Sequence, residues 1–133
     1  MFAVSARMHE LLKAKVGAVT ADVADGNTDT PWVKMDDARQ VYAVAQAFDI
    51  DNNGTITVQI RAADELDGSG ADDVGDPVTV TSGANESDLV AEVSKRAEEL
   101  GKPCVGARLT GADTGDTKDA SIQLVLGDRR YSP

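Results

Sequence analysis

The sequence predicts a mainly β protein: a β-sandwich or jelly-roll-like domain with one inserted α-helix at about residues 86–100. Apolar and polar residues alternate strictly along residues 55–61, which is typical of a half-buried strand because strand side chains point to opposite faces in turn. Further short β-branched runs are separated by clusters of Gly, Asp, Asn and Thr, as in antiparallel β-domains. We assign residues 31–133 to one β-rich domain, preceded by an arm or first elements in residues 1–30.

Composition excludes several classes of protein. A chain of 133 residues can bury a core without cross-links, and its single cysteine, Cys104, excludes a disulfide framework. A net charge of −10 opposes binding to phosphate backbones, so we expect no nucleic-acid partner. The sequence has no apolar run long enough for a membrane span and no signal-peptide pattern at its start, so we expect no membrane partner and synthesis in a cytoplasm.

The first thirty residues allow two interpretations. Residues 4–16 place Val4, Met8 and Leu11 on one face at helical spacing, which indicates a short amphipathic helix packed on the sheet. Alternatively, the segment is a strand plus an arm that is ordered against a partner. Residues 18–25 alternate weakly as a strand does, residues 26–31 have the composition of a loop, and residues 32–35 resume extended structure.

Residues 39–62 predict an antiparallel hairpin at the centre of the domain. Residues 41–48 are apolar on both alternating faces, which is typical of a strand covered on both sides. A polar segment ending in Asn53-Gly54, the strongest short turn signal, separates them from residues 55–62.

The remaining elements follow in order. Residues 62–76, rich in Gly and acids, form a loop, and residues 77–82 form a short strand whose proline stands at the tolerated first position. Residues 104–110 and 120–127 form two more strands, and the apolar side chains of the last point inward: Ile122, Leu124 and Leu126.

The helix prediction for residues 86–100 rests on capping and periodicity. Asn85 can cap the N-terminus, with Asp88 at the capping-box position. Gly101 and Pro103 would end the helix. The expected apolar stripe consists of Leu89, Val93, Ala97 and Leu100, with Val90 beside it.

Residues 49–56 match the opening of an EF-hand calcium loop. Asp49, Asp51 and Asn53 occupy the first three ligand positions and Gly54 the sixth. Position 12 is Ile60, however, where the motif needs a bidentate Glu, and the flanks read as strands. An Asn-Gly turn explains the same residues without metal, so we predict no metal site and keep these three as calcium candidates.

No constellation supports catalysis. His9 is the single histidine, which makes a Ser-His-Asp or Cys-His pair improbable, and Cys104 reads as a small buried hydrophobe. No glycine pattern follows a strand and opens a helix as phosphate loops require. We therefore predict a protein that is not an enzyme and has no cofactor.

Beside these inferences stands a resemblance. The chain resembles the small structural proteins encoded beside the major capsid protein of tailed phages, among them capsid cement or decoration proteins. The resemblance rests on four stretches: W-V-x-M-x-D-A-R-Q-V-Y-A-V, then G-T-I-T-V-Q-I-R-A-A-D, a G-A-R-L-T strand and the ending L-V-L-G-D-R-R-Y-S-P. The resemblance covers about residues 31–133. It implies a non-enzymatic subunit, commonly trimeric, that binds the major capsid protein across capsomer junctions on the virion surface.

We therefore expect a capsid-stabilising homo-oligomer, with a neck or tail component or a calcium-dependent β-sandwich binding module as alternatives. A basic, aromatic tail on an acidic chain suits docking on an acidic neighbour. The residues expected to contact partners are Phe2, Val4, Met8, Trp32, Arg129, Arg130 and Tyr131.

Overall fold

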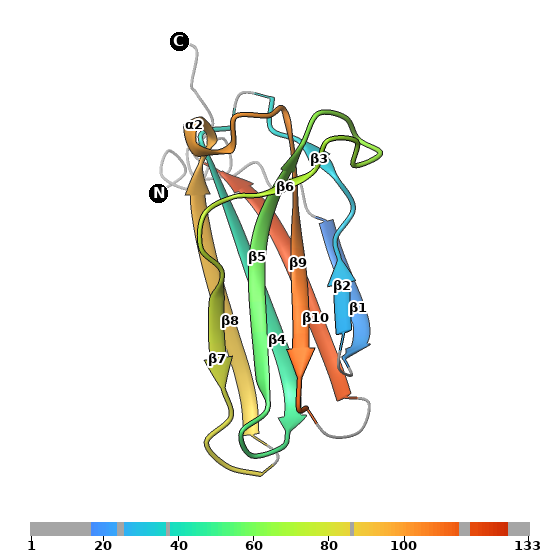
Figure 1. The fold of residues 1–133 in the computed structure, drawn as a ribbon, viewed down its shortest axis with the longest axis vertical. Coiled ribbons are helices and arrows are strands. Elements are labelled where there is room, and N and C mark those ends of the chain that lie inside the picture. Colours follow the sequence, from blue (N-terminus) through green and yellow to red (C-terminus); the bar gives the residue numbers. More distant parts are fainter. Residues whose placement is uncertain (1–16, 24–25, 37, 86, 115–117, 128–133) are drawn as a thin grey trace, which may run out of the picture.

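The computed structural model describes residues 17–23, 26–36, 38–85, 87–114 and 118–127. Their strands form two antiparallel sheets packed face to face (Figure 1). We call the sheet at the back of Figure 1 sheet A and the sheet at the front sheet B. The predicted fold class, a mainly β sandwich, is confirmed.

Sheet A has the strand order β1-β10-β4-β8. Its strands are β1 (Gly17–Val23), β10 (Lys118–Gly127), β4 (Gln40–Ile50) and β8 (Ser87–Arg96). Large and small side chains meet along its inner rows, as where Ala45 of β4 lies between Ile122 and Ala91. Such rows let a core with many alanines fill its volume.

Sheet B is built on the long pairing of β9 (Cys104–Ala112) with β5 (Thr55–Ala63). The short strands β2 (Gly26–Asp29) and β3 (Val33–Lys34) pair with β9. On the other side, β6 (Asp72–Asp73) and β7 (Val78–Thr81) pair with β5.

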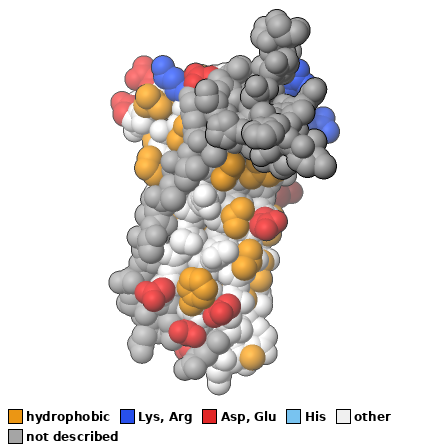
Figure 2. Space-filling model, turned by 180° about the vertical axis from the view of Figure 1, so that it is seen from behind, with side chains coloured by type: hydrophobic (Ala, Val, Ile, Leu, Met, Phe, Trp, Pro, Cys, Tyr) orange, Lys and Arg blue, Asp and Glu red, His pale blue; other side chains and the backbone are white. Residues whose placement is uncertain are grey.

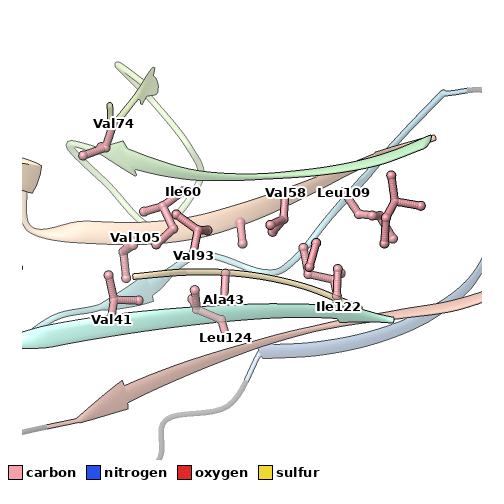
Figure 3. Packing of buried hydrophobic residues seen from close by; sticks show 14 of the residues in the cluster. Val41, Ala43, Val58, Ile60, Val74, Val93, Val105, Leu109, Ile122 and Leu124 are labelled. Carbon is pink, nitrogen blue, oxygen red and sulfur yellow. The ribbon is translucent and has the colours of Figure 1, made fainter. Parts of the chain in front are cut away.

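The core lies between the sheets (Figure 3). Side chains from all four long inner strands meet there and are buried: Val41 and Ala43 of β4, Val58 and Ile60 of β5, Val105 and Leu109 of β9, and Ile122 and Leu124 of β10. The inward orientation predicted for Ile122, Leu124 and Leu126 is confirmed.

The predicted hairpin over residues 39–62 is wrong. Its two strands and its turn exist, and Gly54 N donates to Asp51 O at 2.9 Å. However, β4 pairs with β10 and β8 while β5 pairs with β9, so residues 51–54 cross from one sheet to the other. The crossing lets the apolar faces of both strands bury each other. Side-chain alternation is the same in either topology, so it could not reveal the crossing.

The prediction that both faces of this strand are covered is also wrong for the described part of the chain. Val41, Ala43, Ala45 and Ala47 are buried, but Tyr42 and Phe48 on the opposite face are exposed.

The helix predicted over about residues 86–100 is wrong over most of its length. Residues 87–96 are strand β8, and only α2 (Ala97–Leu100) is helical. Leu89, Ala91 and Val93 are buried in alternation with exposed neighbours, because β4 pairs with residues 89–96 and the opposite sheet covers their inward side chains. Intrinsic helix propensity is a weak preference that such pairing overrides.

The helix ends behave differently from the prediction as well. Asn85 Oδ1 does not cap a helix but accepts a hydrogen bond from Asn52 N at 3.3 Å. The start of α2 is fixed by Arg96 N, which donates to Glu99 Oε2 at 2.8 Å. The predicted stop at Gly101 is confirmed, because this residue has φ 68° in the left-handed region that glycine adopts readily.

Other elements agree closely with the prediction. Strands occur near residues 18–25, 77–82, 104–110 and 120–127, while two segments predicted as loops contain short strands: residues 26–31 contain β2 and residues 62–76 contain β6. The predicted helix or arm at residues 4–16 lies outside the described residues.

Candidate interaction surface

The outward side of β4, β8 and β10 forms the surface that we call face A. Figure 2 shows it from behind, with hydrophobic side chains running down its length. Its exposed large hydrophobic residues are Tyr42 (37% exposed), Phe48 (41%) and Val90 (51%). Val44 and Val125 are half-buried on the same side. A sheet face this apolar and accessible is suited to contact with another molecule.

One end of face A contains a shallow depression of about 270 Å³ between β4 and β8. Ala43 and Val93, which pair in register, form its floor. The rim consists of Tyr42 and Val44 on β4 and Glu92 and Ser94 on β8. Tyr42 Oη donates a hydrogen bond to Gln40 Oε1, which orients the phenol along the strand.

The other end of face A joins an aromatic ring to acidic side chains. Ala47 of β4 pairs with Ala120 of β10, and Phe48 and Asp119 are the next residues beyond this pair. On the other side Ala47 pairs with Leu89 of β8, and the register between β4 and β8 then shifts before Ile50. Asp49 follows Phe48 directly, and its backbone N donates to Asp88 Oδ1 at 3.3 Å. All these acids are exposed. Figure 2 shows acidic side chains gathered around a hydrophobic one near the lower end of this face.

The outer side of sheet B differs in kind, because its polar side chains satisfy one another. Thr57 Oγ1 and Thr79 Oγ1 lie 2.8 Å apart, and Thr110 Oγ1 donates to Asn27 Oδ1 at 2.8 Å. Arg108 binds Asp29 through two donors, at 2.7 and 3.1 Å. This hydrogen bond with Asp29 is the main cause that raises the pKa of Arg108. A face whose polar groups are already paired gains less from a new partner.

Trp32, predicted to contact a partner, is half-buried over sheet B. A Cβ added at Gly106 would lie 3.0 Å from the indole, and one at Gly68 would lie 2.7 Å from its Nε1. The ring thus packs between β9 and the loop after β5. The other predicted contact residues, Phe2, Val4, Met8, Arg129, Arg130 and Tyr131, lie outside the described residues, as does His9.

The calcium candidates lie at the crossing between the sheets. Backbone contacts hold this segment, since Asp51 N donates to Thr114 O at 3.3 Å and Asn53 N donates to Ser82 O at 2.9 Å. Asp49 and Asn53 adopt left-handed φ of 59° and 68°. Within the described residues, no group of three or more His, Cys, Asp or Glu side chains could hold a metal ion.

The acidic loop between β5 and β7 is partly neutralised by two cations. Lys102 Nζ contacts Asp72 Oδ2 at 2.8 Å and Asp64 Oδ2 at 4.0 Å, and Arg61 Nε contacts Asp73 Oδ1 at 2.9 Å. The hydrogen bond from Lys102 is the main cause that lowers the pKa of Asp72. Asp67 also has a lowered pKa, chiefly because Ser69 donates to it. Such contacts hold this surface loop in place.

Cys104 is a buried free thiol on β9, as predicted for a small core residue. No helix in the described part of the chain has the length and hydropathy needed to span a bilayer.

The sequence did not predict Tyr42, Phe48 and Val90 as surface residues. Residues 41–48 do carry a signal, because they are apolar on both alternating faces. Such a pattern is typical of a strand covered on both sides, but it does not distinguish a cover from the same chain from one supplied by a partner.

Neither a protein-family model nor a curated protein sequence matches this chain. Among solved structures, it is similar to CBM27-1 of Caldicellulosiruptor saccharolyticus in complex with mannohexaose, with TM-score 0.53 and 9% identity over 86% of this chain and 76% of that one. A structure described as CBM4 gives TM-score 0.46 and 13% identity, covering 90% and 80%. The infectious bursal disease virus Gx strain structure gives TM-score 0.45 and 13% identity, covering 91% and 34%. Of these three, only the CBM27-1 likeness exceeds a TM-score of 0.5, and at 9% identity it establishes the fold alone: a β-sandwich.

Proposed function

We propose that this chain is a virion structural protein: a capsid cement or decoration subunit, trimeric on the head surface, that binds the major capsid protein across capsomers. The single observation that carries the proposal is face A, where Tyr42, Phe48 and Val90 are exposed on one side of a sandwich whose other outer side is polar and internally paired. The resemblance of residues 31–133 to such proteins supports the same role.

A modest apolar face suffices for this function. Each copy gains little from a few exposed side chains, but an oligomer that contacts several capsomers at once turns each further contact into an intramolecular event. The acidic body, with net charge −10, favours solubility before assembly. The same reasoning fits a neck or tail component, and a ring of more than three subunits would favour that alternative.

The test is co-sedimentation of the purified protein with heads assembled from the major capsid protein that we expect to be encoded beside it. We expect Tyr42→Lys to weaken binding at least about tenfold, since a buried interface tyrosine often contributes about 2 kcal/mol. Thr81→Lys, an exposed change on β7 of sheet B, is the matched control and should bind like the wild type. Equal loss in both variants, or no binding by the wild type, would refute the proposal.

Glycan binding is a second candidate, because the depression on face A combines an aromatic ring with a carboxylate and a hydroxyl from Tyr42, Glu92 and Ser94. CBM27-1, of similar fold, was solved with mannohexaose. Calorimetric titration with mannohexaose tests it directly. Heat of binding that disappears in Glu92→Gln would favour a glycan over the capsid as the partner of this depression, and no heat would remove this hexasaccharide as the ligand.

A further inference from the structure

The Phe48 end of face A is an apolar surface with carboxylates at its rim. Phe48 is 41% exposed, and Asp119 stands one residue beyond the Ala47–Ala120 pair. Asp88 Oδ1 accepts a hydrogen bond from the backbone N of Asp49, the residue after Phe48. Arg96, an exposed residue of β8, lies at the opposite end of face A, where it pairs in register with Gln40. A partner for this end must therefore bring positive charge together with a planar or apolar group.

The chain itself contains a segment of that chemistry. Residues 128–133 read D-R-R-Y-S-P, with adjacent arginines followed by an aromatic residue. An arginine guanidinium binds carboxylates through paired hydrogen bonds and also stacks on aromatic rings. Phe48 with its flanking aspartates offers both kinds of contact within one small area.

The reach of this segment decides which copy supplies it. β10 ends at Gly127, which pairs with Gln40 at the start of β4. Phe48 lies about 27 Å further along β4 at the usual strand rise. The Arg130 backbone can lie at most about 11 Å from Gly127. The remaining distance is longer than an arginine side chain, so a chain's own arginines can reach the depression at Tyr42 and Glu92 but cannot reach Phe48.

We propose that the Phe48 end of face A binds residues 128–133 of a second copy of this chain. Each copy then offers its acidic end to one neighbour and its basic segment to the other. Such a head-to-tail contact closes into a ring when the rotation between copies permits, as in a trimer, and otherwise continues as an open chain. The inference concerns contacts between copies and does not depend on the capsid as a partner.

Charge exchange tests this proposal in the full-length protein. Sedimentation velocity at low salt should show self-association of the wild type. We expect Asp88→Arg with Asp119→Arg to weaken it at least about tenfold, and Arg129→Glu with Arg130→Glu to do the same. Combining all four changes should restore association, because opposite charges face each other again.

The matched control is Glu65→Arg with Asp76→Arg, which makes the same change in net charge on the exposed loop between β5 and β7. It should associate like the wild type, and circular dichroism melting should show every variant folded. A synthetic peptide of residues 128–133 provides a second measurement that does not depend on variant stability. Titrated into the isotope-labelled protein, it should shift the amide signals around Phe48, Asp88 and Asp119.

Three outcomes would overturn the proposal. The first is a monomeric wild type at a concentration of about 100 µM, well above the range of specific protein contacts. The second is association that survives both charge reversals. The third is a peptide that shifts the signals of Tyr42 and Glu92 and leaves those around Phe48 unchanged, which would show that the segment docks on its own chain.

Discussion

At the scale of single residues, Gly106 is a position where an added side chain would meet the indole of Trp32. A Cβ there would lie 3.0 Å from Trp32 Cε3 and 3.2 Å from Cζ3, so any side chain displaces the indole. We expect Gly106→Val to lower the free energy of unfolding by about 1–3 kcal/mol despite the better strand propensity of valine. Urea unfolding measures this loss. The fluorescence of the single tryptophan should shift to the red in the folded variant.

Gly83→Ala is the control, because nothing lies within 4 Å of the added Cβ. It should leave both the unfolding midpoint and the emission unchanged. A Gly106→Val protein as stable as the wild type, with the same emission, would mean that Trp32 does not pack on β9.

Lys102 and Asp72 make a residue-scale prediction about pH. The hydrogen bond from Lys102 and then its charge lower the pKa of Asp72 below 3.8, and Asp72 in turn raises the pKa of Lys102 above 10.5. A lowered carboxyl pKa means that this contact stabilises the fold above about pH 4 and is lost as pH falls through the folded pKa. The raised pKa of Lys102 has the corresponding effect at high pH. The stabilisation that depends on protonated Lys102 is lost as pH rises through its folded pKa.

We expect Lys102→Met to raise the pKa of Asp72 toward 3.8, followed by carbon-detected NMR titration of its carboxyl. Lys34→Met, an exposed change on β3, should leave the Asp72 titration as it is. Identical Asp72 curves in the wild type and Lys102→Met would show that the contact is absent in solution.

At the scale of elements, β8 gives the clearest test, because the helix and strand interpretations bury different side chains. Ala91 is 1% exposed in the strand, whereas the predicted helix would have pointed it away from the stripe of Leu89, Val93 and Leu100. We expect Ala91→Glu to cost at least about 3 kcal/mol or to prevent folding, since it buries a charge. Val90→Glu places the same group on the 51% exposed neighbour and should change stability by less than about 0.5 kcal/mol. Thermal unfolding compares the two variants. A larger loss of stability in Val90→Glu than in Ala91→Glu would favour the helix over the strand.

β8 also shows why the positions of strands and turns were easier to predict from the sequence than the partners with which the strands pair. The alternation of Leu89, Ala91 and Val93 was readable, but Asn85, Asp88 and Gly101 also stand where helix ends prefer them. The sequence therefore carries local signals for a strand and for a helix. Pairing with the β4 backbone decides in favour of the strand. In the same way, Asn53-Gly54 was correctly predicted as a turn, while the sheet that the next strand joins depends on which apolar faces bury each other.

At the scale of the whole molecule, the sequence predicted that the outer side of β4 is apolar, but it did not predict that this side is exposed. The sequence of β4 carries apolar residues on both faces, and in the described part of the chain sheet B covers one of them. The acidic end at Phe48 was not visible in the sequence, because Asp49, Asp88 and Asp119 come from three separate strands. Their proximity results from how β10 and β8 pair with β4, including the register shift between Ala47 and Ile50.

The net charge predicts that added salt raises the stability of the fold and weakens the association between copies. A chain with a charge of −10 repels itself more when compact, so screening should favour the folded state. Between 20 and 500 mM NaCl, we expect the unfolding midpoint of the dilute protein to rise by roughly 3–5 °C, equivalent to about 1 kcal/mol. The contact proposed between Phe48 and residues 128–133 joins opposite charges, so the same salt should weaken association in sedimentation. The control is the same midpoint series with Arg129→Glu and Arg130→Glu combined, whose larger negative charge should steepen the rise. A midpoint that falls with salt would show that ion pairs such as Arg108–Asp29, not self-repulsion, dominate the electrostatics of this fold.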